Sequence, residues 1–166
     1  MLQRWKTRAR AEDGFTLVEL MTVLVVLSAL MLLSMGTFFG ARARSQDSAA
    51  KQGATKALET ARIVFTDSAS YATVVPGDLD TAEPSMRFVD GATSSGTPLT
   101  ASTDVSDPTG HIFIAAVYSE AGKCFFIRDW TTLGIHYAVD ADATAAECMA
   151  GDTSGTTGWN SRWPTT

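Results

Sequence analysis

The chain of 166 residues is poor in the residues on which catalytic and metal sites usually depend. It contains two histidines, His111 and His136, and two cysteines, Cys124 and Cys148. Their spacing is not that of a zinc site, and the sequence has no Gly-x-Ser-x-Gly turn, phosphate-binding loop or EF-hand pattern. We therefore expect no enzyme, no metal site and no cofactor.

Proline is absent from the first 75 residues, so nothing there forces a helix to break. Residues 15–39 are almost wholly apolar and carry one charge. As a helix this run would span about 37 Å, which exceeds the roughly 30 Å hydrocarbon layer of a membrane. It is also too long for the apolar core of a secretory signal peptide. We predict a transmembrane helix.

Acidic residues are missing from the first ten positions, which hold four basic residues. Residues 15–166 hold nine basic and sixteen acidic residues, so the body of the chain is acidic. A basic head before an apolar run places the N-terminus in the cytoplasm and the rest of the chain outside it. The acidic body argues against a broad nucleic-acid-binding face, and no specific nucleic acid is predicted.

Residues 40–70 continue the helix with an amphipathic pattern, in which small and apolar residues recur at three- and four-residue spacing. We read one helix from about Phe15 to about Ser70, with a first half suited to lipid and a second half suited to a protein core. Glu59 and Arg62 have the spacing of a supporting surface pair.

Residues 71–166 change in character and predict a sheet. Strands are expected at 86–90, 111–119, 123–130 and 134–140, with a hairpin at 120–122. Residues 74–85 are rich in turn residues, and Gly91–Gly110 is expected to be a long, flexible loop. The fold class is therefore α+β: a long helix whose second half packs on a small antiparallel sheet.

Two cysteines in an exported domain suggest one disulfide, Cys124–Cys148, although two buried thiols are the alternative. The bond would contribute about 3 kcal/mol in the chain-entropy model. Trp159 and Trp163 are expected to pack onto the sheet rather than to form an exposed contact site. The acids of the tail are expected to be solvated turn residues rather than calcium ligands: Asp140, Asp142 and Asp152.

Glu19 is the single charge in the apolar run. A charge at the centre of a membrane helix costs about 2.5–3.5 kcal/mol on insertion scales. Glu19 lies only about one turn into the run, so its carboxylate can reach the interface between lipid and water. The alternative is that Glu19 has a partner elsewhere.

The stretch Gly14–Leu20, read as Gly-Phe-Thr-Leu-Val-Glu-Leu after a basic leader and before about twenty apolar residues, resembles the class III signal of type IV pilins and pseudopilins. The resemblance implies a pilin-like fold and cleavage by a prepilin peptidase between Gly14 and Phe15. It also implies methylation of the Phe15 amine and loss of the leader, residues 1–14. Glu19 would then pair with the Phe15 amine of a neighbouring subunit in a filament.

The implied domains are the leader at 1–14, the transmembrane and assembly helix at 15–39, the amphipathic helix at 40–70 and the sheet region at 71–166. The implied partners are identical or related pilin subunits, the prepilin peptidase, membrane lipid, and an inner-membrane assembly platform with its ATPase. The precursor would span the cytoplasmic (inner) membrane once, and the mature subunit would enter an extracellular or periplasmic filament.

Gly36 and Gly40 have the small-xxx-small spacing that lets membrane helices approach closely. Glycine also weakens a helix by about 1 kcal/mol relative to alanine. Many pilins have a proline near the position of Gly36 and lose helicity there, whereas this sequence lacks that proline. Close packing, local melting and neither role all remain open from the sequence.

Several functions share this N-terminal pattern. A type IV pilin or pilin-like filament subunit is the leading interpretation. A pseudopilin of a type II secretion system and a minor pilin for DNA uptake or adhesion are the alternatives. A secreted enzyme with an unusual signal anchor is disfavoured, because no catalytic constellation is evident.

Overall fold

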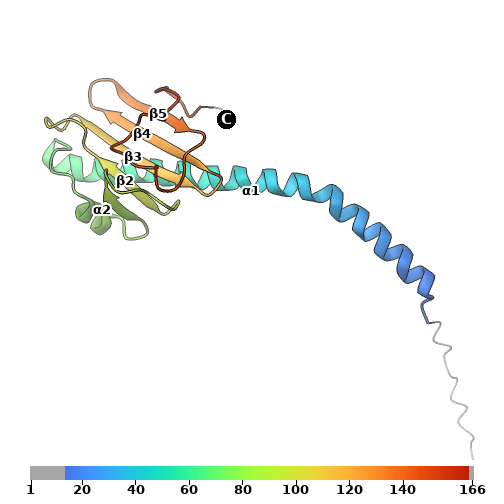
Figure 1. Ribbon diagram of the computed structural model, residues 1–166. Helices are drawn as coiled ribbons and strands as arrows, with labels where there is room; N and C mark the ends of the chain where they lie inside the picture. Colours follow the sequence, from blue (N-terminus) through green and yellow to red (C-terminus); the bar gives the residue numbers. More distant parts are fainter. Residues whose placement is uncertain (1–13, 165–166) are drawn as a thin grey trace, which may run out of the picture. The chain divides into compact units, whose positions relative to one another are not determined.

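The computed structural model describes residues 14–164 and contains two helices and five strands (Figure 1). The chain divides into two compact units, one ending at Gly40 and one beginning at Ala41. The elements, in chain order, are α1 (Leu17–Ser68), α2 (Pro76–Ala82), β1 (Arg87–Asp90), β2 (Thr100–Asp104), β3 (Ile112–Ser119), β4 (Lys123–Trp130) and β5 (Gly134–Asp140).

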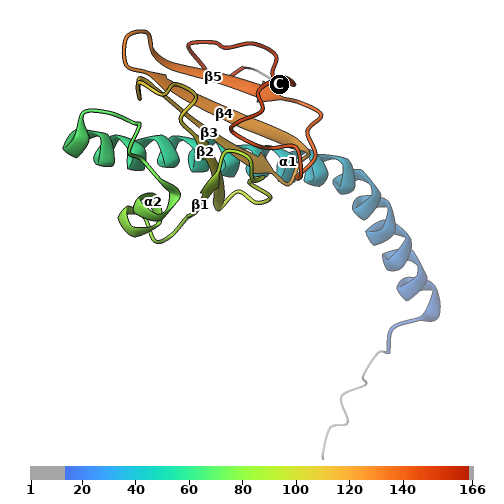
Figure 2. The ribbon, with the colours of Figure 1, turned by 60° about the vertical axis from the view of Figure 1, so that its left-hand side comes forward.

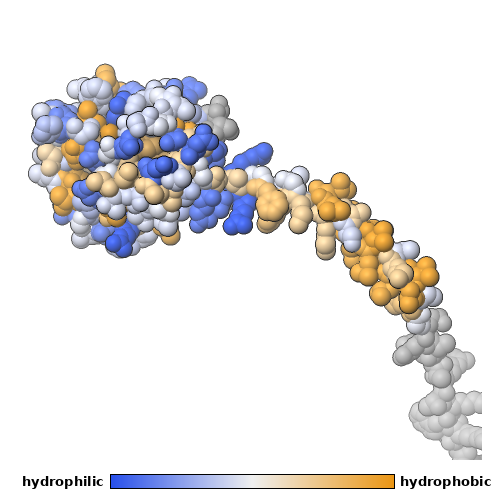
Figure 3. Space-filling view, viewed as in Figure 1, coloured by the Kyte–Doolittle hydropathy of each residue, from blue (hydrophilic) through white to orange (hydrophobic). Residues whose placement is uncertain are grey.

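The first unit consists of the start of α1, and its side chains are exposed along the whole run. Apolar side chains cover most of this half of the helix, as the orange surface in Figure 3 shows. Within the described residues, α1 is the one helix long and apolar enough to cross a membrane by length and composition. The predicted apolar helix is therefore present and has no protein core of its own.

The second unit is a five-stranded sheet in the order β1-β2-β3-β4-β5, with the second half of α1 along one face (Figures 1 and 2). The residues after β5 cover part of the other face, where they join a second apolar cluster. The α+β, pilin-like architecture expected from the sequence is confirmed. The boundaries of α1, β3, β4 and β5 differ from the predicted ones by two residues at most.

Two details of the sheet region differ from the prediction. β1 pairs with β2 in parallel, so the sheet is mostly rather than wholly antiparallel. The expected flexible loop Gly91–Gly110 contains β2, which is buried at its three central residues. The short helix α2 forms in the turn-rich segment, where Pro76 occupies the first helical turn and its fixed φ suits that position.

β2 escaped prediction because its sequence, Thr-Ala-Ser-Thr-Asp, lacks the apolar alternation of a typical strand. Its buried hydroxyls have partners inside the fold. Ser102 donates to the carbonyl of Asp90 at 3.3 Å and Thr103 donates to the carbonyl of Val89 at 3.2 Å. Ser102 also accepts a bond from the Ala150 amide at 2.9 Å. These bonds allow a polar strand to occupy a buried position.

The face of α1 that meets the sheet is made mostly of small residues. Besides the polar Asp47 and Thr60, its buried members are Ala50, Gly53, Ala54, Ala57, Leu58 and Ala61. A Cβ placed on Gly53 would lie 2.6 Å from the carbonyl oxygen of Pro98 and 3.3 Å from a methyl group of Val117. The helix therefore lies so close to the rest of the fold that only glycine fits at this point.

A buried carboxylate, Asp129 of β4, anchors the C-terminal end of α1. Arg62 of α1 donates to Asp129 through Nε at 2.8 Å, and the Tyr71 hydroxyl donates to the same oxygen at 2.6 Å. The expected surface pair of Arg62 with Glu59 is not what forms, because Asp129 is a buried acid within reach. A buried charge that lacks such partners would be strongly destabilising.

A second buried carboxylate, Asp47, anchors α1 at the other end of the seam, where the buried part of the helix begins. Asp47 accepts a bond from the Ser119 hydroxyl at 2.8 Å and from Lys123 Nζ at 2.9 Å. Ser119 and Lys123 flank the hairpin between β3 and β4. The seam of small residues is therefore fixed at both ends by charged hydrogen bonds to the sheet.

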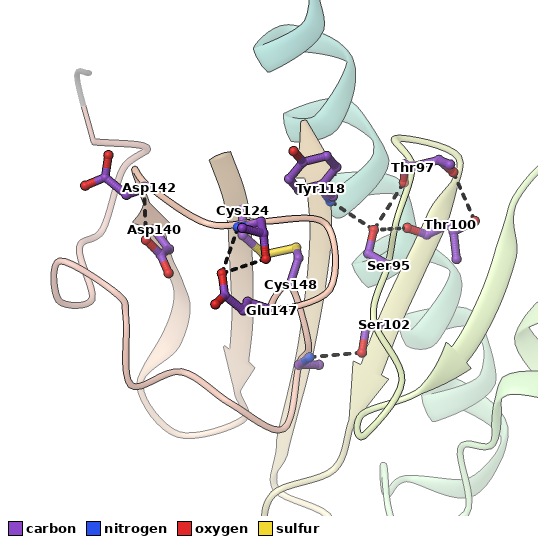
Figure 4. The surroundings of a disulfide bond; sticks show 12 residues. Ser95, Thr97, Thr100, Ser102, Tyr118, Cys124, Asp140, Asp142, Glu147 and Cys148 are labelled. Carbon is purple, nitrogen blue, oxygen red and sulfur yellow. Dashed lines mark hydrogen bonds between the residues drawn. A yellow bond between two sulfur atoms is a disulfide. The ribbon is translucent and has the colours of Figure 1, made fainter. Parts of the chain in front are cut away.

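The disulfide Cys124–Cys148 ties β4 to the segment after β5, with 5.4 Å between the Cα atoms (Figure 4). Both cysteines are fully buried in the outer apolar cluster. Beside them, the Ser95 amide donates to the Cys148 carbonyl at 2.8 Å, and the Ser95 hydroxyl accepts a bond from the Tyr118 amide at 2.9 Å. The disulfide therefore lies next to hydrogen bonds that attach the loop before β2 to β3 and to the segment after β5.

Burial, together with the hydrogen bond to Asp129, raises the pKa of the Tyr71 hydroxyl above its usual value. In the unfolded chain Tyr71 loses its proton near pH 10, whereas the folded chain keeps it to higher pH. Stability contributed by this proton is therefore present below about pH 10 and falls as pH rises further. We predict that the melting temperature of Tyr71→Phe falls less between about pH 9.5 and 11.5 than that of the unsubstituted chain.

Tyr137→Phe is the matched control, because this tyrosine is half-buried on β5 and belongs to the same core. Thermal unfolding of the detergent-solubilised chain measures the slope in each variant. An alkaline slope in Tyr71→Phe equal to that of the unsubstituted chain would contradict the assignment.

Candidate functional site

The start of α1 is preceded by three exposed residues, Gly14, Phe15 and Thr16, that are not helical. Phe15 is 87% exposed. A Cβ placed on Gly14 would meet no atom within 4 Å, and Gly14 does not have the positive φ that favours glycine. Nothing in the described fold requires glycine here, so a requirement for glycine would come from a molecule that binds this segment.

Thr16 and Glu19 form a capping box at the first turn of α1. The Glu19 amide donates to the Thr16 hydroxyl at 3.2 Å. In return, Glu19 Oε2 accepts bonds from the Thr16 amide at 3.0 Å and the Thr16 hydroxyl at 2.8 Å. This exchange satisfies backbone amides that the first turn of a helix leaves without partners.

Thr16 belongs to the stretch that resembles the pilin signal, but the resemblance assigns it no role of its own, whereas the structure makes it the helix cap. The signal for it is nevertheless in the sequence, since Thr-x-x-Glu before an apolar run is the pattern of a capping box. The same pattern recurs at Thr144 and Glu147, where Glu147 Oε2 accepts bonds from the Thr144 amide at 2.9 Å and hydroxyl at 2.7 Å.

The capping box changes the interpretation of Glu19. In this structure the Glu19 carboxylate has a partner in its own chain, so it is more than an acid that reaches toward water. Only Oε2 is engaged, and no hydrogen bond to Oε1 occurs within residues 14–164. Glu19 can therefore hold the start of its own helix and still present one oxygen to a cation.

Gly36 and Gly40 lie within the continuous helix α1, so the structure shows no melting at either residue. Their spacing places them on the same side of the helix, one turn apart. A Cβ at either position would meet no atom within 4 Å. Their use in packing against another helix stays a prediction.

The remaining polar residues singled out from the sequence do not converge. Among residues 14–164, no group of three or more His, Cys, Asp or Glu side chains is placed to hold a metal ion. His111 is exposed before β3, and His136 lies half-buried on β5. Asp142 and Asp152 are exposed, and hydrogen bonds from Ser154 lower the pKa of the Asp152 carboxyl.

The two tryptophans of the tail are half-buried and contact different faces of the sheet. Trp163 lies with its ring centroid 4.6 Å from that of Tyr137 and 5.6 Å from that of Phe125, in the core that faces α1. Trp159 belongs to the outer cluster, where it stacks on Arg128. Their expected packing on the sheet is what the structure shows.

Comparison with protein families matches residues 9–35 to the model of the prokaryotic N-terminal methylation motif. The matched range includes Gly14, Phe15 and Glu19, and its first five residues precede the part of the chain that the structure describes. The chain therefore carries the hallmark of the type IV pilin class III signal peptide. No curated protein and no solved structure matches the chain.

The capping box predicts that Thr16→Val loosens the first turn of α1. Loss of an N-cap hydroxyl costs about 1 kcal/mol, so the first turn should exchange its amide protons about fivefold faster. Thr16→Ser keeps the hydroxyl and serves as the control. Hydrogen exchange of residues 17–22 in detergent micelles measures the effect, and equal protection in both variants would contradict the role of Thr16.

Proposed function

We propose that this chain, which carries the N-terminal motif of a type IV pilin-like precursor, is a structural subunit of a filament. The precursor is held in the cytoplasmic membrane by the first half of α1. A prepilin peptidase cuts it between Gly14 and Phe15 and methylates the new amine. The mature subunit of 152 residues then polymerises through its N-terminal helix.

The observation that carries this proposal is the coincidence of the methylation motif with the start of α1. The motif covers residues 9–35, and the bond between Gly14 and Phe15 lies in an exposed, non-helical stretch just before the capped first turn. A peptidase needs an extended and accessible substrate segment, and the helix begins two residues beyond the proposed cut.

Electrostatics supports the proposed role of Glu19 in assembly. Cleavage creates a cation at Phe15, and a methylated secondary amine keeps that charge at neutral pH. In an apolar setting an ammonium and a carboxylate attract strongly, whereas each alone is penalised. The oxygen of Glu19 that the capping box leaves open would accept the Phe15 amine of a neighbouring subunit.

The exposed apolar half of α1 supports a filament for a second reason. Its large apolar side chains are exposed in the described chain. Lipid covers such a surface in the membrane, and the same halves of neighbouring subunits would cover it in a filament. Gly36 and Gly40 would lie at points of close helix approach.

A type IV pilus is the filament that we propose, with a type II secretion pseudopilin or a minor pilin as the alternatives. Electron microscopy of sheared surface material tests this choice. Long filaments built mainly of this chain are expected, whereas a trace component of other filaments, or none on the surface, would favour the alternatives.

Gly14→Val should block cleavage without disturbing the fold, because a side chain at residue 14 meets no atom of the chain. We expect the full precursor to accumulate in membranes of a host that also makes a prepilin peptidase. Immunoblotting against the second unit measures the ratio of precursor to cleaved chain. Gly77→Val, at another open position, is the control, and normal cleavage of Gly14→Val would contradict the proposed cut.

Glu19→Gln should leave cleavage intact and reduce filament yield by at least about tenfold, because the amide cannot form the charged pair with the Phe15 amine. Glutamine keeps an oxygen that can accept bonds from Thr16, so the capping box is largely spared. Asp67→Asn, an exposed acid on the same helix, is the control. Normal filament yield from cleaved Glu19→Gln subunits would contradict the role of Glu19.

A further inference from the structure

Arg128 and Asp129 are neighbours in β4, so their side chains point to opposite faces of the sheet. They differ in whether they have a charged partner. Asp129 faces α1 and is bound by Arg62 and Tyr71. Arg128 faces the outer side, directly across from Ile114 of β3 and His136 of β5. Arg128 therefore lies on the face of the sheet that carries the outer apolar cluster, to which Ile114 belongs.

Two tryptophans flank this guanidinium. Its central carbon lies 4.2 Å from the ring centroid of Trp159 and 5.5 Å from that of Trp130. The Nε atom is buried and has no hydrogen-bond partner in the described part of the chain. Burial lowers the pKa of Arg128, and no acid among the described residues forms an ion pair with it.

This arrangement costs free energy in the isolated subunit. A partly desolvated cation is stabilised by aromatic faces, but a buried N–H without an acceptor is penalised. Three other cations of the second unit have acids beside them: Lys56 with Glu83, Arg62 with Asp129 and Lys123 with Asp47. Among the described cations that form no ion pair, Arg128 is the one with a buried side-chain nitrogen that lacks a hydrogen-bond partner.

We propose that Arg128 binds a carboxylate on a second copy of this chain, with Trp130 and Trp159 forming the apolar part of that contact. Arginine and tryptophan are the residues most enriched where protein interfaces derive their binding energy. A carboxylate suits the site because it accepts two parallel N–H bonds from a guanidinium.

Charge complementarity identifies the second copy as the occupant. Residues 15–166 carry sixteen acids and nine basic residues, so identical subunits repel one another unless the exposed cations meet acids. The same excess of acid repels a nucleic acid. Exposed carboxylates that have no ion pair in the described subunit are numerous: Glu59, Asp67, Asp78, Asp142 and Asp152. This inference rests on the proposed filament.

Arg128→Met separates a binding role from a purely structural one. Methionine fills a similar volume without a charge, so we expect the melting temperature of the subunit to stay the same or to rise. We expect filament yield to fall about tenfold, since a hydrogen bond to a charged group is lost at each contact. A lower melting temperature with normal filament yield would overturn the proposal in favour of a structural role.

Zero-length coupling identifies the partner directly. Filaments assembled from Arg128→Lys subunits are treated with a carbodiimide, which joins an amine to a carboxylate in contact with it. Mixing isotopically heavy and light subunits before assembly distinguishes links between copies from links within one copy. We expect a heavy–light peptide pair that joins position 128 to an Asp or Glu. This pair should be more abundant than the corresponding pair in the control Arg87→Lys, whose side chain is exposed on β1.

The outcomes separate this inference from the proposed function. If unsubstituted chains form no filament, the proposed function fails and the inference fails with it. If filaments form but position 128 couples only within its own copy, or not at all, the inference alone is overturned.

Discussion

The close contact between the second half of α1 and the sheet is the constraint on which the second unit depends. Alanines and Gly53 form the contacting face of the helix, and a single added carbon at Gly53 would overlap the carbonyl of Pro98. Small residues bury little apolar area each. The charged hydrogen bonds of Asp47 and Asp129 at either end of the seam therefore fix the position and register of the helix as well as contributing stability.

The first half of the same helix has large exposed side chains in place of small buried ones. It exposes large apolar side chains along residues 17–39. Water is a poor solvent for such a surface, which fits a membrane-anchored precursor. At its start, Thr16 and Glu19 form hydrogen bonds to each other. The backbone amides of these two residues therefore have acceptors within the subunit itself.

Much of the fold could be predicted because its periodicities are strong. The apolar run, the small-residue face of the helix and the alternation in β3 and β4 each identify their element. β2 could not be predicted in this way, because Ser102 and Thr103 are buried through hydrogen bonds to residues distant in sequence. The partner of Arg62 could not be predicted for a similar reason. Glu59 is near Arg62 in sequence, but the folded sheet places Asp129 beside it instead.

At the candidate site, the sequence identified Gly14, Phe15 and Glu19 through the motif, and the pairing of Cys124 with Cys148 through compartment chemistry. It also contained the capping pattern that makes Thr16 the local partner of Glu19. The lack of an ion pair at Arg128 could not be predicted, because an arginine next to an aspartate in a strand is typical of an ordinary surface position. Its meaning depends on Trp159, which only the folded tail brings over it.

The proposed function depends on cleavage and methylation of the precursor at the start of α1. Intact mass and N-terminal sequencing of the chain purified from its native membranes or filaments test both steps. We predict a subunit of 152 residues that begins at Phe15 and carries one methyl group on its amine. A mature chain that begins at Met1, or at any residue other than Phe15, would contradict it.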